Sequence, residues 1–131
     1  MKLVVDASVA LAAAATPHGF ARFRRHELIA PGLLRYETSS ALHEAAWRGE
    51  LAADQSGRTH ERLLEAGIAL VDSVELSREA WRVADEFGWA KTYDASYVAL
   101  ARINACQLVT LDARLRRGTE RLGFVIAPGE L

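Results

Sequence analysis

The sequence predicts an α/β protein, a three-layer α/β/α sandwich built around a central parallel sheet. Short apolar segments alternate with longer helix-favouring segments along the whole chain. The first apolar run, Leu3 to Val5, shows no polar alternation, which is typical of a strand covered on both faces. No tight hairpin signal joins one strand to the next, so helices link the strands and the strands run parallel.

Five short apolar segments are the predicted strands of this sheet. The second of them ends at Pro31-Gly32, a pair that stops a strand and turns the chain. In chain order the predicted strands are Leu3–Val5, Leu28–Ala30, Ile68–Val71, Leu108–Leu111 and Phe124–Ile126.

Helical segments fill the intervals between these strands. Ser77 is a suitable N-cap for a helix that runs to Phe87, before Gly88 breaks the pattern. The segment Asp94–Asn104 is apolar on most sides, which indicates a buried helix. The other predicted helices are Val9–Ala15, Leu33–Arg48, Ala52–Glu65 and the short basic Asp112–Gly118, while Phe20–Glu27 carries three arginines on an exposed face.

Length and composition limit the class of protein. A chain of 131 residues forms one domain, residues 1–131, with a sizeable core of its own. The net charge of −1 means that any nucleic-acid contact must come from a local basic surface. The single cysteine excludes an internal disulfide and fits a reducing cytosol, and Met1 leads directly into the first strand. We therefore expect a cytoplasmic protein with no signal peptide and no membrane contact.

Four acidic residues stand at strand ends or on helices that can pack beside them. Asp6 and Asp112 each follow a predicted strand and begin a helix, and Asp94 begins the buried helix. Any one such Asp, taken alone, is explained as a helix N-cap. Glu37 is more informative, because it shares a helical stripe with Leu34 and two alanines, and Glu is almost never buried without a partner.

Together the four acids predict one site at the carboxyl edge of the sheet, where open α/β sheets bind ligands. Clustered carboxylates repel each other, and hard oxygen ligands suit Mg²⁺ or Mn²⁺. Such sites activate a water and offset charge on a phosphodiester. Ser8 and Thr110, each two residues from an acid, are placed to orient carboxylates or waters, or simply to cap helices. The chain has no phosphate-binding P-loop, dinucleotide-binding fingerprint or serine nucleophile elbow.

Four stretches resemble the motifs of PIN-domain proteins, and most closely those of VapC-type toxins from toxin–antitoxin pairs. They are Val4–Ser8, Glu37–Leu42, Thr92–Ala101 and Val109–Asp112, and they follow the family order over nearly the whole chain. The resemblance implies a metal-dependent endoribonuclease whose acidic site is Asp6, Glu37, Asp94 and Asp112. It also implies a homodimer that can enter a larger assembly and is silenced by a VapB-type antitoxin, which wraps the toxin and points a basic side chain at the acids.

The resemblance assigns a role to each polar residue of the site. Asp6 and Asp94 would hold the Mg²⁺ or Mn²⁺ ion, and Asp112 would help directly or through water. Glu37 would orient or deprotonate the attacking water, or hold a second ion. The basic residues that follow would grip the RNA backbone, or alternatively form a solvated helix face: Arg114, Arg116 and Arg117.

Two alternative functions stay open. One is a PIN-like module that has lost catalysis and only binds a protein or RNA partner, against which the intact acid set argues. The other is a phosphatase that forms a phospho-aspartate at Asp6, which would want a second acid where Ser8 stands. The three tryptophans are predicted to be core or interface anchors rather than base-stacking platforms: Trp47, Trp81 and Trp89.

Overall fold

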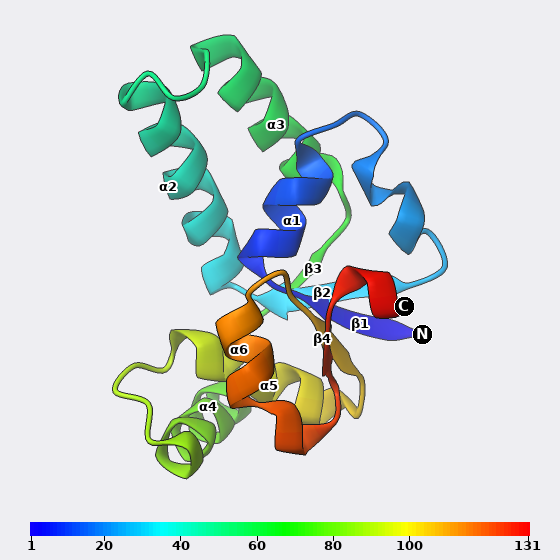
Figure 1. Ribbon diagram of the computed structural model, residues 1–131, viewed down its shortest axis with the longest axis vertical. Coiled ribbons are helices and arrows are strands. Elements are labelled where there is room, and N and C mark those ends of the chain that lie inside the picture. The colour runs from blue at the N-terminus through cyan, green and yellow to red at the C-terminus, as the bar shows by residue number, and fades with distance from the viewer.

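The structure, a computed structural model, describes residues 1–131 and confirms the α/β/α sandwich with a parallel sheet (Figure 1). All four strand pairings are parallel, and the strand order is β3-β2-β1-β4-β5. The five predicted strands are all present, and their bounds are β1 Lys2–Val5, β2 Glu27–Pro31, β3 Ala69–Val71, β4 Gln107–Val109 and β5 Val125–Ile126.

The strand order puts β1 in the middle of the sheet, and this placement determines where the site lies. Val4 of β1 pairs with Ile29 of β2 on one side and with Leu108 of β4 on the other. Because the strands are parallel, the chain leaves β1, β2 and β4 at the same edge. Asp6 therefore stands at the centre of the carboxyl edge, with the segment after β4 beside it.

Six α-helices cover the sheet in two layers. In Figure 1, α1, α2 and α3 lie on one side of the strands, and α4, α5 and α6 lie on the other. The bounds are α1 Ala7–Ala14, α2 Leu33–Trp47, α3 Ala53–Glu65, α4 Val74–Phe87, α5 Tyr93–Asn104 and α6 Ala113–Gly118, with short 3₁₀ helices at Gly19–Phe23, Glu120–Leu122 and Pro128–Glu130.

The core consists of two apolar clusters, the larger of which includes side chains from α1 to α5. Leu3 and Val5 of β1 pack in the cluster that contains Val9 of α1, whereas Val4 packs in the cluster that contains most of α5. This alternation follows from the period of two along a strand. Six of the twelve residues of α5 are buried, which confirms the predicted buried helix. Burying these apolar side chains supplies most of the stability of the fold.

The predicted start of α4 is wrong by one helical turn. The N-cap is Ser73, whose side chain accepts a hydrogen bond from the backbone N–H of Leu76 at 3.1 Å. Ser77 lies inside the helix instead. The physical reason is Leu76, which is buried on α4, so the helix begins early enough to include it. The predicted break at Gly88 is confirmed, because Gly88 ends the helix with a left-handed φ of 69°.

Two of the three tryptophans are not core residues. Trp47 is 81% exposed on the last turn of α2, and Trp81 is 67% exposed on α4. Trp81 lies off the stripe that α4 buries, which runs through Leu76, Ala80, Val83 and Ala84. Trp89 is partly buried and stacks on Phe87. None of the helices combines the length and apolar character that crossing a membrane would require.

Candidate active site

Asp6 is held at the carboxyl edge by three hydrogen bonds. It is the N-cap of α1, and its Oδ1 accepts from the backbone N–H of Val9 at 3.1 Å and from the Ser8 hydroxyl at 2.6 Å. Its Oδ2 accepts from the Thr110 hydroxyl. Asp6 is 8% exposed, so these bonds offset the cost of burying a carboxylate. Ser8 and Thr110, singled out in the sequence, therefore both contact Asp6.

The same two hydroxyl groups connect the end of β1 to the segment after β4. Thr110 Oγ1 accepts from the backbone N–H of Asp112, and Ser8 Oγ accepts from that of Leu111, both at 3.0 Å. Asp112 is in turn the N-cap of α6, where its Oδ1 accepts from two backbone N–H groups at 2.9 and 3.2 Å. The hydroxyl groups of Ser8 and Thr110 thus hold the Asp6 carboxylate and the backbone at Asp112 in a fixed relative position.

Glu37 has a partner that sequence analysis did not identify. The hydroxyl of Tyr97, on α5, donates a hydrogen bond to Glu37 Oε1 at 2.6 Å. Tyr97 is only 2% exposed, and Glu37 is half-buried. A signal was present in the sequence, because Tyr97 follows Asp94 by three residues and residues three apart share a helix face. The side chains of Asp94 and Tyr97 therefore both face the acidic edge of the sheet.

The carboxylate of Glu37 is harder to ionise than an ordinary Glu. Burial raises its pKa, the Tyr97 hydrogen bond acts in the opposite direction, and the charges of Asp94 and Asp6 raise it further. The pKa of Tyr97 is itself raised, first by burial and then by its bond to Glu37. The hydroxyl therefore remains protonated and keeps donating to Glu37.

Asp94 is also harder to ionise than usual. Burial raises its pKa, followed by the charges of Asp112 and Asp6, while the nearby guanidinium of Arg114 lowers it. No hydrogen bond from within the chain reaches the Asp94 carboxylate. Each of the four predicted acids thus lies near enough to another to affect its ionisation, and the structure brings the set to one edge of the sheet.

No basic side chain of the protein neutralises this cluster by a direct ion pair. The six ion pairs of the chain all involve other acids: Glu44, Asp54, Glu79 and Glu86. No three Asp, Glu, His or Cys side chains converge closely enough to hold a metal ion between them. The donor set nevertheless fits Mg²⁺ or Mn²⁺, because these cations prefer oxygen ligands and are commonly bound through one or two carboxylates and several waters.

The three predicted RNA-binding arginines differ in their surroundings. Arg114 and Arg117 are exposed on α6 and make no ion pair. Arg116 is half-buried, and its guanidinium donates a 3.0 Å hydrogen bond to the backbone carbonyl of Thr110. Arg116 therefore braces the chain beside Asp6, whereas Arg114 and Arg117 have side chains that can reach a ligand.

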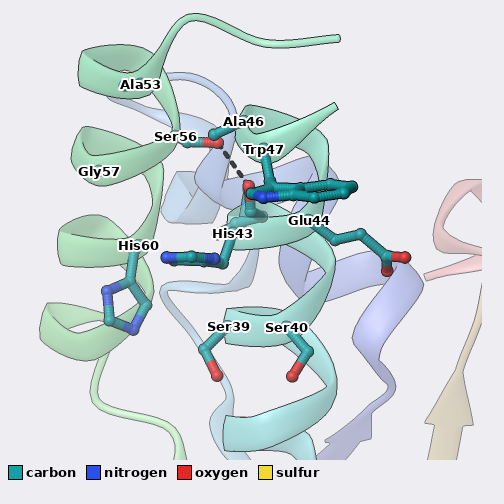
Figure 2. A pocket seen from close by; sticks show the side chains of 11 residues that line it. Ser39, Ser40, His43, Glu44, Ala46, Trp47, Ala53, Ser56, Gly57 and His60 are labelled. Atoms are coloured by element: carbon teal, nitrogen blue, oxygen red, sulfur yellow. Dashed lines mark hydrogen bonds between the residues drawn. The ribbon is translucent and has the colours of Figure 1, made fainter. Parts of the chain in front are cut away.

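A separate groove of about 740 Å³ lies between α2 and α3. Figure 2 shows His43 of α2 and His60 of α3 in this groove, with the indole of Trp47 near the end of α2. Ser56 of α3 donates a hydrogen bond to the carbonyl of Leu42 at 2.7 Å and ties the two helices together. None of the four predicted acids lines this groove, so it is distinct from the acidic edge.

The α/β/α fold and its acidic edge define a protein of the PIN type. The family model for the PIN domain matches residues 3–120, and the chain belongs to the PIN-domain family.

The relatives are of VapC type. The chain is 36% identical to Ribonuclease VapC9 of Mycobacterium tuberculosis over 115 residues, which is 86% of this chain and 87% of that protein. It is 38% identical to Ribonuclease VapC3 of Pyrobaculum aerophilum over 136 residues, covering 98% of this chain and 100% of that protein. Among solved structures, PAE2754 from Pyrobaculum aerophilum superposes with a TM-score of 0.79 at 26% identity, covering 99% of this chain and 91% of that one.

Proposed function

We propose that this protein is a Mg²⁺- or Mn²⁺-dependent endoribonuclease and the toxin of a toxin–antitoxin pair. The observation that carries the proposal is the gathering of four carboxylates at the carboxyl edge, none of which has an ion-pair partner in the chain. The names of the VapC relatives support RNA as the substrate class.

Asp6 and Asp94 are the proposed metal ligands, and Asp112 assists directly or through water. The hydrogen bonds to Asp6 fill both lone-pair sites of Oδ1 and leave one on Oδ2, and no group of the chain donates a hydrogen bond to Asp94. When bound, the divalent ion would offset negative charge on the phosphate and lower the pKa of a water.

Glu37 is the proposed general base. Tyr97 occupies Oε1, so Oε2 is the atom that remains to accept a proton from the attacking water. The hydrogen bond from Tyr97 fixes the orientation of the carboxylate while it does so. The raised pKa of Glu37 makes it a stronger base than an ordinary Glu, as general-base catalysis requires.

Arg114 and Arg117 are proposed to hold the RNA backbone next to the acids. Both are exposed on the helix that Asp112 begins, and the charge of Arg114 already acts on Asp94. A guanidinium pairs well with a phosphate, because its planar fork can donate two parallel hydrogen bonds.

The proposed protein partners are a VapB-type antitoxin and a second copy of the chain, and larger assemblies of these would form in the cytoplasm. The antitoxin would direct a basic side chain at the acids, which lack a cation of their own. Its apolar segment would dock in the groove between α2 and α3, where the exposed indole of Trp47 offers an aromatic surface for an apolar side chain.

The direct test is to map cleavage sites on total RNA with the purified protein. Cleavage at defined positions in Mn²⁺, and none in EDTA, is expected. A protein that binds RNA but cuts nothing in either condition would favour the catalytically silent PIN-like module instead. Release of phosphate from a phosphomonoester would favour the phosphatase alternative.

A further inference from the structure

We propose that a second groove, next to the acids, binds unpaired nucleobases of the substrate by stacking them on aromatic side chains. This inference rests on the proposed function. The groove has a volume of about 720 Å³ and lies where β2 and β3 end. Three aromatic residues that line it define what we call the aromatic groove: Tyr36, Trp81 and Tyr93.

The three rings come from three different helices and are all largely in solvent. Tyr36 of α2 is 72% exposed, Trp81 of α4 is 67% exposed and Tyr93 of α5 is 57% exposed. Large apolar side chains scattered singly on a surface need no explanation, but here three aromatic rings gather around one hollow. Such a gathering indicates a site for a flat, apolar group.

The aromatic groove borders the acidic edge, although none of the four acids lines it. Tyr36 directly precedes Glu37 on α2, and Tyr93 directly precedes Asp94 on α5. A polymer whose phosphodiester lies against these acids would therefore have its neighbouring nucleotide at the groove. This proximity favours the substrate over an unrelated ligand.

The remaining groups of the groove suit a nucleotide. Six of the sixteen lining residues are polar, among them Ser73, Ser77 and Thr92, whose hydroxyl groups can bond base edges or a ribose. Arg35 also lines the groove, and it makes no ion pair in the chain. The volume is within the range of small-molecule sites.

Stacking on these rings requires a base that is free of its own duplex partner. Single-stranded RNA is recognised in this way because unpaired bases can be splayed onto aromatic faces. Stacking tolerates any sequence, because every base has a π-face. The groove would therefore select single-stranded regions of RNA and discriminate little among the four bases.

A binding assay tests this inference, because its result does not depend on whether the protein cleaves RNA. Short single-stranded oligoadenylate, and the same ribose-phosphate chain without bases, are titrated onto the full protein in EDTA and followed by fluorescence anisotropy. We expect the wild type to prefer the base-bearing chain by about tenfold or more. Trp81→Leu, which keeps apolar area but loses the indole, is expected to lose most of that preference, and Trp81→Phe to retain it.

Two results would overturn the inference. One is equal binding of both probes by the wild type; the other is an unchanged preference in Trp81→Leu. If the preference is unchanged and light scattering shows that Trp81→Leu alters the oligomeric state, the groove is a contact between copies of the chain. Cleavage in Mn²⁺ is scored separately, so a protein that stacks bases without cutting RNA contradicts the nuclease proposal alone.

Discussion

The hydroxyl of Tyr97 donates a 2.6 Å hydrogen bond to Oε1 of Glu37 and joins α5 to α2 beside the acidic edge. This bond lowers the pKa of Glu37, although burial and the neighbouring acids hold that pKa above its usual value. Tyr97 thus acts on the proposed general base from a buried position and does not touch the substrate.

Tyr97→Phe tests this relationship. The loss of a hydrogen bond to a charged group costs about 1.5–3 kcal/mol, so kcat should fall by about tenfold or more. Without the donor, the pKa of Glu37 rises further, so Glu37 becomes protonated at higher pH. The acidic limb of the pH–rate profile should therefore move to higher pH, with KM little changed. A uniform loss of rate with an unshifted profile would contradict a role through Glu37.

Thr110→Val tests the hydrogen bonds that hold Asp6. The substitution keeps the shape of a fully buried side chain but removes the donor to Asp6 and the acceptor for the backbone N–H of Asp112. We expect a loss of about 1–3 kcal/mol in the free energy of unfolding, and a marked loss of cleavage. Thr119→Val is the matched control, because Thr119 is equally buried and its hydroxyl donates only to the carbonyl of Leu115. The control should lose stability and keep activity; equal losses of activity would argue against an orienting role for Thr110.

Stability should depend on pH and on metal in a linked way. The folded-state pKa values of Glu37 and Asp94 are raised, so the folded chain binds more protons than the unfolded chain. The stability that these groups contribute is therefore present at low pH and lost as pH rises through their folded pKa values. At neutral pH, a divalent ion at a hundred times its Kd adds about 2.7 kcal/mol, which corresponds to a Tm shift on the order of 10 °C.

Asp94→Asn separates the two contributions, because Asp94 accepts no hydrogen bond whose loss would complicate the result. The variant should have a higher Tm than the wild type in EDTA, since one repelling charge is gone, and a smaller increase in Mn²⁺. Melting curves of both proteins at neutral pH give both quantities. An identical Mn²⁺ shift in the two proteins would remove Asp94 from the proposed ligands.

Trp47→Ala tests the proposed antitoxin groove between α2 and α3. Trp47 is largely exposed, so the substitution should leave the fold unchanged. Removing an aromatic anchor from an interface costs about 2 kcal/mol or more, so inhibition by the cognate antitoxin should need about thirtyfold more antitoxin. The comparison is a titration of antitoxin against RNA cleavage by each protein. Unchanged inhibition would place the antitoxin elsewhere.

The sequence predicted the features that local chemistry determines. Apolar runs identified all five strands, and the strand-to-helix positions of Asp6 and Asp112 followed from the capping preference of Asp. Strand order was not predictable, because it depends on packing between distant segments. The spacing from Asp94 could place Tyr97 on the acidic face of its helix, but Glu37 is sixty positions away, so no local pattern could identify it as the partner. The sequence left Trp81 as a core or interface residue, and the structure excludes only the core, because its helix buries a different stripe.

The most direct test of the acidic site is the cleavage rate of Asp94→Asn in Mn²⁺, measured against Asp85→Asn. Asp85 is an exposed acid on α4 that makes no ion pair, so its replacement controls for the loss of one charge. A metal ligand is worth several kcal/mol in the transition state, and about 1.4 kcal/mol is a factor of ten in rate. We predict that Asp94→Asn cuts RNA on the order of a hundredfold to a thousandfold more slowly, while Asp85→Asn keeps the wild-type rate. A folded Asp94→Asn protein that cuts at nearly the wild-type rate would contradict the proposed metal site.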